Sequence, residues 1–118
     1  MTQLLTRDDN NQAVWVPVCE LNDILLHAGV AAKVNGKQVA IFRVEEEVLY
    51  AISNFDPFTK ANVLSRGIVG TRGGVYKVAS PLLKHSFNLQ TGEYLDDPTI
   101  KVPTFEVRVE NGKVWVKG

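Results

Sequence analysis

The sequence predicts an all-β fold built from antiparallel sheets, arranged as a sandwich or a barrel. The clearest strand pattern lies at residues 105–109, where apolar and charged side chains alternate with a period of two residues. Asn111-Gly112 separates this stretch from a second apolar run at 114–116. Asn-Gly favours a type I′ hairpin turn, because both central residues of that turn need a positive φ angle. Turn residues also recur between short apolar runs along the rest of the chain, which is typical of an all-β domain.

The remaining elements follow from turn residues and from breaks in the apolar pattern. Asn35-Gly36 predicts a second hairpin of the same type. Pro17 lies within the first expected strand, and we expect that strand at a sheet edge because proline cannot donate a backbone hydrogen bond. Residues 21–25 indicate a single helical turn. Strands are further expected at 13–19, 29–34, 38–44, 48–52, 75–79, 86–89 and 93–95, with turns at 45–47, 73–74 and 90–92.

Composition limits the class of protein. The 118 residues are 45 % hydrophobic, which fits one domain, and the chain is long enough to bury a single core. Thirteen basic residues balance thirteen acidic ones, and this balance argues against nucleic acid as the main partner and against a polybasic membrane anchor. Cys19 is the sole cysteine, so no internal disulfide can form. With no signal-peptide pattern and no long apolar run, we expect a cytoplasmic protein without a membrane partner.

Residues 54–98 differ in character from the rest of the chain. They hold three of the five prolines and five of the nine glycines. We therefore expect a single domain over residues 1–118, in which a loop-rich subdomain at about 54–98 is inserted into a β base at about 13–53 and 99–118.

Two loops of this region resemble the metal-binding loops of the Rieske family. A Rieske [2Fe–2S] centre is held by two thiolates on one iron and two imidazoles on the other. The first family motif, Cys-Pro-His-x-Gly, aligns with residues 56–60. The second, Cys-Pro-x-His-Gly-x-x-Phe-x-x-x-x-Gly, aligns with 80–92 without a gap, and Pro81, Phe87 and Gly92 match it. The resemblance covers most of the chain and implies a Rieske-like antiparallel fold.

The metal-ligand positions of the family are all changed here. They are Asp56, Phe58, Ser80 and Leu83. Both glycines that follow the family's histidines are lysines, Lys60 and Lys84, which suggests that close backbone approach is no longer required there. Because Phe58 and Leu83 carry no donor atom, and an iron–sulfur cluster needs thiolate or imidazole, we expect no metal or cofactor in this chain.

Several of these side chains allow two interpretations. Phe58 and Leu83 either pack against each other in the space of a cluster, or form an exposed apolar patch that marks an interface. Asp56 either starts a turn or faces a partner. His85 indicates a partly buried, hydrogen-bonded loop histidine rather than a catalytic one, because no nucleophile stands at a recognisable spacing from it.

The chain further resembles the small-subunit family of assimilatory NADH-dependent nitrite reductases. These enzymes are oxidoreductases of nitrate assimilation. The stretches that carry this resemblance are 53–58, 63–70 and 79–84. It implies a large-subunit partner with FAD, sirohaem and an iron–sulfur cluster, which takes electrons from NADH and reduces nitrite to ammonium. The present chain would be a non-catalytic subunit, with no catalytic residue of its own. The alternative is a metal-free Rieske-like binding module of another redox system, such as a relative of the ferredoxins of aromatic-ring dioxygenases.

The two loops are the candidate surface for docking to the partner. The candidate residues are Phe55, Asp56, Pro57, Phe58, Lys60, Ser80, Pro81, Leu83, Lys84 and His85. A small β-barrel that binds nucleic acid is a weaker alternative, because the sequence lacks a basic face and a run of stacking aromatics.

Overall fold

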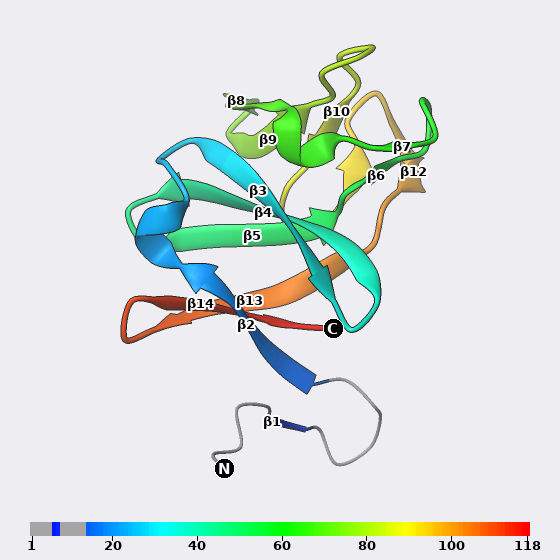
Figure 1. Cartoon of the computed structure of the whole chain (residues 1–118). Helices are drawn as coiled ribbons and strands as arrows, with labels where there is room; N and C mark the ends of the chain where they lie inside the picture. Colours follow the sequence, from blue (N-terminus) through cyan, green and yellow to red (C-terminus); the bar gives the residue numbers. More distant parts are fainter. Residues whose placement is uncertain (1–5, 8–13) are drawn as a thin grey trace.

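A long antiparallel sheet forms the base of the molecule in a computed structural model that describes residues 6–7 and 14–118. The strand order within these residues is β1-β2-β14-β13-β5-β4-β3 (Figure 1). The strands are β1 (Thr6–Arg7), β2 (Val14–Glu20), β3 (Ala28–Val34), β4 (Lys37–Glu45), β5 (Val48–Ser53), β13 (Thr104–Glu110) and β14 (Lys113–Lys117). The predicted all-β class is confirmed. Residue 13, the expected start of the first strand, and the polar stretch around it lie outside the described residues.

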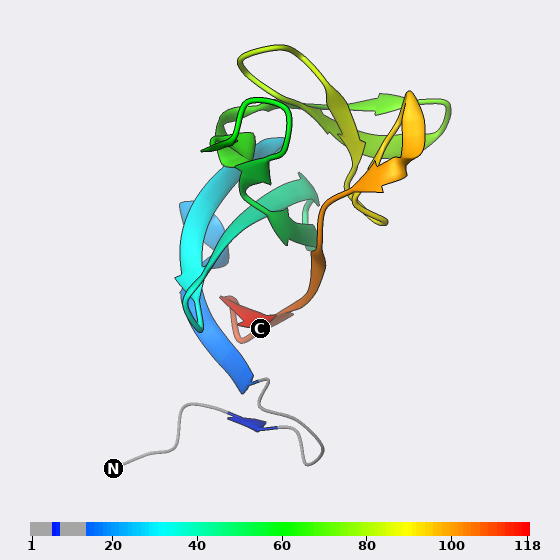
Figure 2. The same ribbon diagram turned by 90° about the vertical axis from the view of Figure 1, so that its right-hand side faces the viewer.

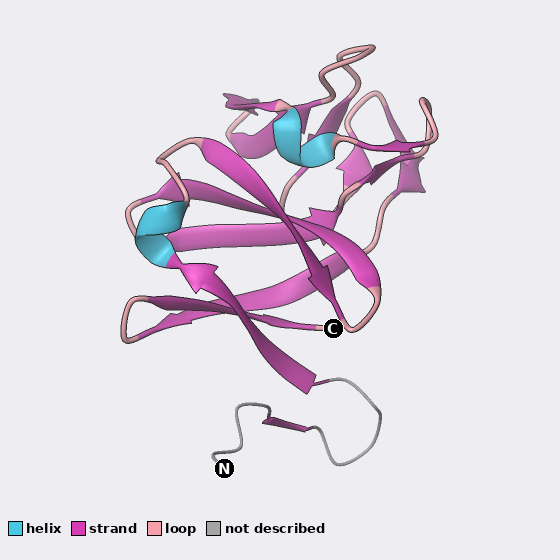
Figure 3. Cartoon of the chain, viewed as in Figure 1, coloured by secondary structure: helices cyan, strands magenta, loops and turns pink. Residues whose placement is uncertain are grey.

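A second antiparallel sheet lies above the base, as two perpendicular views show (Figures 1 and 2). Its order within the described chain is β12-β11-β10-β9-β8. The elements of this part are β6 (Phe55–Asp56), β7 (Ala61–Asn62), η2 (Leu64–Arg66), β8 (Ile68–Arg72), β9 (Val75–Ala79), β10 (Ser86–Asn88), β11 (Glu93–Tyr94) and β12 (Asp97–Lys101). Short strands therefore occupy much of the region that we expected to be loop-rich. Figure 3 shows that helix is confined to brief turns, and no helix of the described chain is long and apolar enough to span a bilayer.

Strand β4 separates two hydrophobic cores. Successive side chains of a strand point to opposite faces. Val39 and Ile41 accordingly enter the core of the base, whereas Ala40, Phe42 and Val44 enter the core beneath the second sheet. All five side chains are fully buried. Because one strand serves both cores, the second sheet is packed onto the base as part of a single structure.

The hairpin turns have the predicted geometry. Asn35 and Gly36 have φ angles of 51° and 82°, and Asn111 and Gly112 have 54° and 75°. These left-handed values are those that a type I′ turn requires. Both predicted hairpins are confirmed.

Pro17 stands at an irregular point of β2. It lies opposite Trp115 where the β2–β14 register shifts, and the described part of β1 pairs only with Val14 and Trp15. At Pro17 the strand therefore has β14 as its described partner, which agrees with the predicted edge position.

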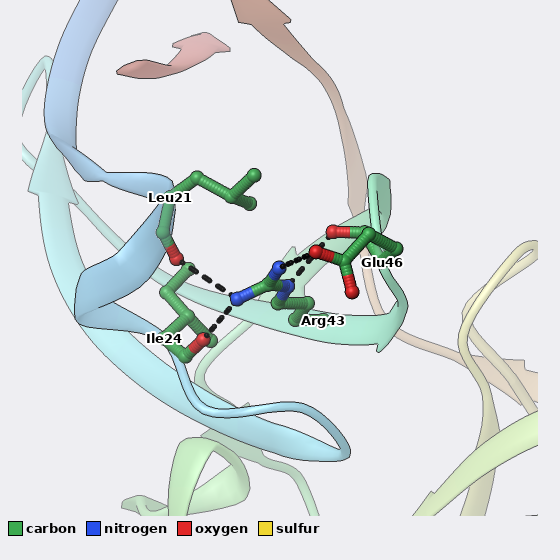
Figure 4. Close-up of polar contacts among 4 residues, drawn as sticks. All are labelled: Leu21, Ile24, Arg43 and Glu46. Atoms are coloured by element: carbon green, nitrogen blue, oxygen red, sulfur yellow. Dashed lines mark hydrogen bonds and ion pairs between the residues drawn. The ribbon is translucent and has the colours of Figure 1, made fainter. Parts of the chain in front are cut away.

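A buried arginine fixes the helical turn η1 (Leu21–Asp23) to the base (Figure 4). Arg43 Nη1 donates to the carbonyl oxygens of Ile24 at 3.0 Å and Leu21 at 3.4 Å. Its Nε donates to the carbonyl oxygen of Glu46 at 2.9 Å, and Nη2 pairs with the Glu46 carboxylate at 3.3 Å. The guanidinium thus satisfies carbonyl groups from two separate turns. The predicted helical turn is present, shortened to three residues.

We expect Arg43→Met to lower the free energy of unfolding by about 3 kcal/mol, because the carbonyl of Ile24 would lose the guanidinium as its donor, and that of Leu21 would keep only the Ile24 amide. Urea denaturation checks this value. Glu46→Gln is the control. The Glu46 side chain is 85 % exposed, so loss of its charge should lower the free energy of unfolding by at most about 1 kcal/mol. Equal effects of the two changes would contradict the assignment.

Candidate functional site

The two loops that resemble metal-binding loops lie side by side at the end of the molecule opposite the C-terminus (Figures 1 and 2). We call residues 55–60 and 80–85 together the tip. The first loop joins β6 to β7, and the second joins β9 to β10. In the described chain β6 and β7 form a separate two-stranded sheet, whereas β9 and β10 belong to the five-stranded one, so loops from different sheets meet in space.

Both loops have the same backbone turn. The amide of Lys60 donates to the carbonyl oxygen of Asp56 at 2.7 Å, and the amide of Lys84 donates to that of Ser80 at 2.9 Å. Lys60 and Lys84 have φ angles of 61° and 60°, in the left-handed region that favours glycine. The replacement of glycine by lysine has therefore left the backbone conformation of a glycine turn in place.

A third turn of this kind follows the second loop. The amide of Gly92 donates to the carbonyl oxygen of Asn88 at 2.7 Å, and Gly92 has a φ angle of 81°. A Cβ atom on Gly92 would lie 2.1 Å from the carbonyl oxygen of Val102. Glycine is therefore required sterically at 92.

Asp56 and Ser80 link the two loops through their side chains. Their exposed fractions are 0 % and 1 %. The Ser80 hydroxyl donates to Asp56 Oδ2 at 2.5 Å, and the amide of Phe58 donates to Asp56 Oδ1 at 2.9 Å. Both carboxylate oxygens are thus hydrogen-bonded inside the tip.

These hydrogen bonds control the ionisation of Asp56. Burial alone would raise the pKa of the carboxyl group, but the bonds from Ser80 and from the Phe58 amide outweigh burial and lower it. The backbone amide of Thr59 lowers the pKa of Asp56 further. Asp56 is therefore an ionised, internally satisfied group.

An aromatic cluster fills the space beside this link. The rings of Phe58 and His85 stack with centroids 3.8 Å apart and an interplanar angle of 13°. Tyr94 meets both rings edge-on, at 4.8 Å from Phe58 and 5.4 Å from His85. His85 is partly buried, as predicted, but the hydrogen bond that we expected is not found at its Nδ1 atom, which is buried without a partner in the described structure.

The predicted packing of Phe58 against Leu83 is wrong. Leu83 is 60 % exposed, and its neighbour Leu82 is 57 % exposed. The flat ring of His85 covers Phe58 face to face, as stacked aromatic rings can, and the turn directs Leu83 to solvent. The alternative interpretation, an exposed apolar patch, holds for Leu83 and not for Phe58.

The candidate docking residues divide into three groups by exposure. Exposed are Phe55, Lys60, Pro81, Leu83 and Lys84; half-buried are Pro57, Phe58 and His85; buried are Asp56 and Ser80. The exposed group combines apolar side chains with two ammonium groups. Residues 55–62 and 80–85 contain one carboxylate, that of Asp56, which faces inward. The outer face of the tip is therefore apolar and cationic.

Sequence reasoning missed two supports of the tip. Asn54 is buried; its Oδ1 accepts from the amide of Ser65 at 2.7 Å, and its Nδ2 donates to the carbonyl oxygen of Asn62 at 3.2 Å. Beside the second sheet, Arg72 Nη2 donates to Asp96 Oδ1 at 2.7 Å, and this contact lowers the pKa of Asp96. Asp96 Oδ2 accepts from the hydroxyl of Tyr94 at 3.4 Å, and the Tyr94 ring packs on the stack of the tip. An asparagine directly before a turn was the available signal for the first support.

The residues at the four family ligand positions do not fit a [2Fe–2S] cluster. Phe58 and Leu83 have no donor atom, and the oxygens of Asp56 and Ser80 are poor ligands for such a cluster. The described residues hold no group of three His, Cys, Asp or Glu side chains that could bind a metal ion. Cys19 lies on β2 in the base, where burial raises the pKa of its thiol and disfavours the thiolate.

We expect Lys60→Gly and Lys84→Gly each to raise the free energy of unfolding by about 0.5–1 kcal/mol, because relief of the left-handed strain exceeds the added entropy of the unfolded chain. Chemical denaturation measures this change. Lys33→Gly, at an exposed position within β3, should instead lower stability. If all three glycine variants lose stability alike, the backbone argument is wrong.

We expect the stability of the protein to fall in acid partly through Asp56. Its folded-state pKa lies below that of an unfolded aspartate, about 3.9. The stabilising contribution is therefore fully present above the unfolded value and is lost as the pH falls through the folded value. Denaturation between pH 7 and pH 2 should show a shallower loss for Asp56→Asn than for the unchanged protein. Parallel curves would contradict the role of the ionised group.

Known proteins share this fold and sequence. Residues 14–117 match the family of Rieske-like [2Fe-2S] domains. The nitrite reductase (NADH) small subunit of Salmonella typhimurium is 43 % identical over 105 residues, which cover 88 % of this chain and 97 % of that protein. A crystal structure from Mycobacterium tuberculosis, described as an NADH-dependent nitrite reductase small subunit, superposes with a TM-score of 0.87 at 41 % identity, over 92 % of this chain and 97 % of that one.

Two further relatives extend the comparison. The NAD(P)H nitrite reductase large subunit of Klebsiella oxytoca is 43 % identical over 102 residues, and the matched part is 86 % of this chain but only 11 % of that protein. A ferredoxin component of naphthalene 1,2-dioxygenase/salicylate 5-hydroxylase systems from a Ralstonia species is 34 % identical over 104 residues, or 94 % of its length. The chain therefore belongs to the Rieske-like domain family, and within it to the family of NADH-dependent nitrite reductase small subunits, as its loop sequences predicted.

Proposed function

We propose that this chain is the non-catalytic small subunit of an NADH-dependent nitrite reductase and that it binds the large subunit through the tip. The observation that carries this proposal is 43 % identity over nearly the whole length of the Salmonella typhimurium small subunit. The match to a short segment of a large subunit adds support, because it places a similar domain on the same polypeptide as that subunit.

The redox chemistry belongs to the large subunit in this proposal. That subunit would hold FAD, sirohaem and an iron–sulfur cluster, take electrons from NADH and reduce nitrite to ammonium in the cytoplasm. The present chain would supply a binding surface, since the ligand positions at 56, 58, 80 and 83 carry side chains that do not fit a cluster.

The surface chemistry of the tip favours an acidic partner with an apolar centre. Lys60 and Lys84 present two cations, and Phe55, Pro81 and Leu83 present apolar area beside them. Complementary charge steers association and fixes orientation, while buried apolar contacts supply affinity. We therefore place the large-subunit contact on these five exposed residues.

The alternative, a module of a dioxygenase-type system, has weaker support. The Ralstonia ferredoxin component is 34 % identical, against 43 % for the nitrite reductase small subunit. Binding of this chain to the purified nitrite reductase large subunit from its own organism distinguishes the two functions. Our proposal expects a complex at micromolar concentration, and no binding under these conditions would overturn it.

We expect the pair Lys60→Glu with Lys84→Glu to weaken binding to the large subunit at least tenfold at low salt, mainly by slowing association, because both charges would then oppose an acidic surface. Surface plasmon resonance, which measures the association and dissociation rate constants, tests this across a range of salt concentrations. The control is Lys33→Glu with Lys37→Glu, which makes the same charge change around the β3–β4 turn, away from the tip (Figure 1). Equal loss in the two pairs, or none in the first, would exclude the tip as the docking site.

A further inference from the structure

We infer that the hydrogen bond between Ser80 and Asp56 holds the two loops of the tip together in the way a metal centre would, so that the docking face exists before the partner binds. The consequence for docking rests on the proposed function. The claim that this bond holds the two loops together concerns this chain alone and can be tested without a partner.

The two loops need a connection of this kind. Each loop is closed within itself by the bond from a lysine amide to a carbonyl four residues earlier. These internal bonds fix the shape of each loop but not its position relative to the other. The loops also belong to separate sheets, because β6 pairs with β7 whereas β9 and β10 pair within the five-stranded sheet of the described chain.

Two described contacts cross between the loops. The deeper one is the bond from the Ser80 hydroxyl to Asp56 Oδ2, between side chains that are fully buried. The outer one is the face-to-face stack of Phe58 on His85. A carboxylate hydrogen bond is stronger than one between neutral groups, and a buried carboxylate that loses its donor is costly. Separation of the loops is therefore strongly resisted at Asp56.

The same two residues also anchor the backbones of the two lysines. The carbonyl oxygen of Asp56 accepts from the Lys60 amide, and that of Ser80 accepts from the Lys84 amide. Ser80 is held further by its own amide, which donates to the carbonyl oxygen of His85 at 2.8 Å. A single side-chain bond thus connects the anchor points of both cationic residues and fixes the spacing of their backbones.

A fixed spacing has a measurable consequence for binding. A surface that is already ordered loses less conformational entropy on association than one that must order itself. Loosening the link should therefore weaken the complex through faster dissociation, whereas the lysine charges themselves act mainly on association.

The test uses the full chain with Ser80→Ala, Asp56→Asn and the double change. Amide hydrogen exchange of Lys60 and Lys84 is the main readout, because both amides close the loops. We expect Ser80→Ala to accelerate exchange at both amides at least tenfold, including the one in the opposite loop. We also expect the double change to add little to either single one. Ser86→Ala, another buried serine of this segment, is the matched control and should leave the Lys60 amide unchanged.

The outcomes separate the link from the proposed function. Acceleration at both lysine amides, with non-additive single changes and faster dissociation from the large subunit, supports the inference. Unchanged exchange at Lys60 in Ser80→Ala, or strictly additive effects, overturns it whether or not a partner binds. If Ser80→Ala does not fold, Ser80→Cys keeps the size and a weaker donor, and should accelerate exchange at Lys60 by a smaller factor. Failure of the unchanged protein to bind the large subunit would count against the proposed function and leave the exchange result standing.

Discussion

The burial of both faces of β4 is the constraint on which the rest of the structure depends. Val39 and Ile41 pack into the base, and Phe42 and Val44 pack beneath the second sheet. A shift of one residue in the register of β4 would exchange these two sets, so both cores resist it together. The second sheet thereby has one position on the base. The loop between β9 and β10 inherits that position, and it therefore meets the loop between β6 and β7, which belong to a separate two-stranded sheet, at one end of the molecule.

The tip shows how a metal-binding scaffold can persist on protein contacts alone. Two positions that would carry thiolates hold a carboxylate and a hydroxyl that bond to each other. A position that would carry an imidazole holds Phe58, which stacks on His85 instead. The remaining one, Leu83, has turned outward and adds apolar area to the surface. The polar link is buried and the aromatic stack above it is half-buried, and the exposed lysines and apolar residues are left for contact.

Local sequence patterns were sufficient for much of the fold. Asn35-Gly36 and Asn111-Gly112 located their hairpins because a type I′ turn is decided by two adjacent residues. The pairing of Asp56 with Ser80 was not predictable in this way, since it joins residues 24 positions apart through the packing of two sheets. The packing of Phe58 was wrongly predicted for the same reason: its choice of neighbour depends on which rings the second sheet brings near.

The turn that occurs twice in the tip and again at 88–92 tolerates replacement differently at its three closing residues. At 92 the Val102 carbonyl leaves no room for a side chain, whereas Lys60 and Lys84 project from exposed positions of the same backbone shape. A glycine at 60 or 84 can therefore give way to a larger residue for a modest conformational cost and without compensating changes elsewhere. This backbone shape can therefore present a charged side chain to solvent at 60 and 84, whereas at 92 it must remain bare.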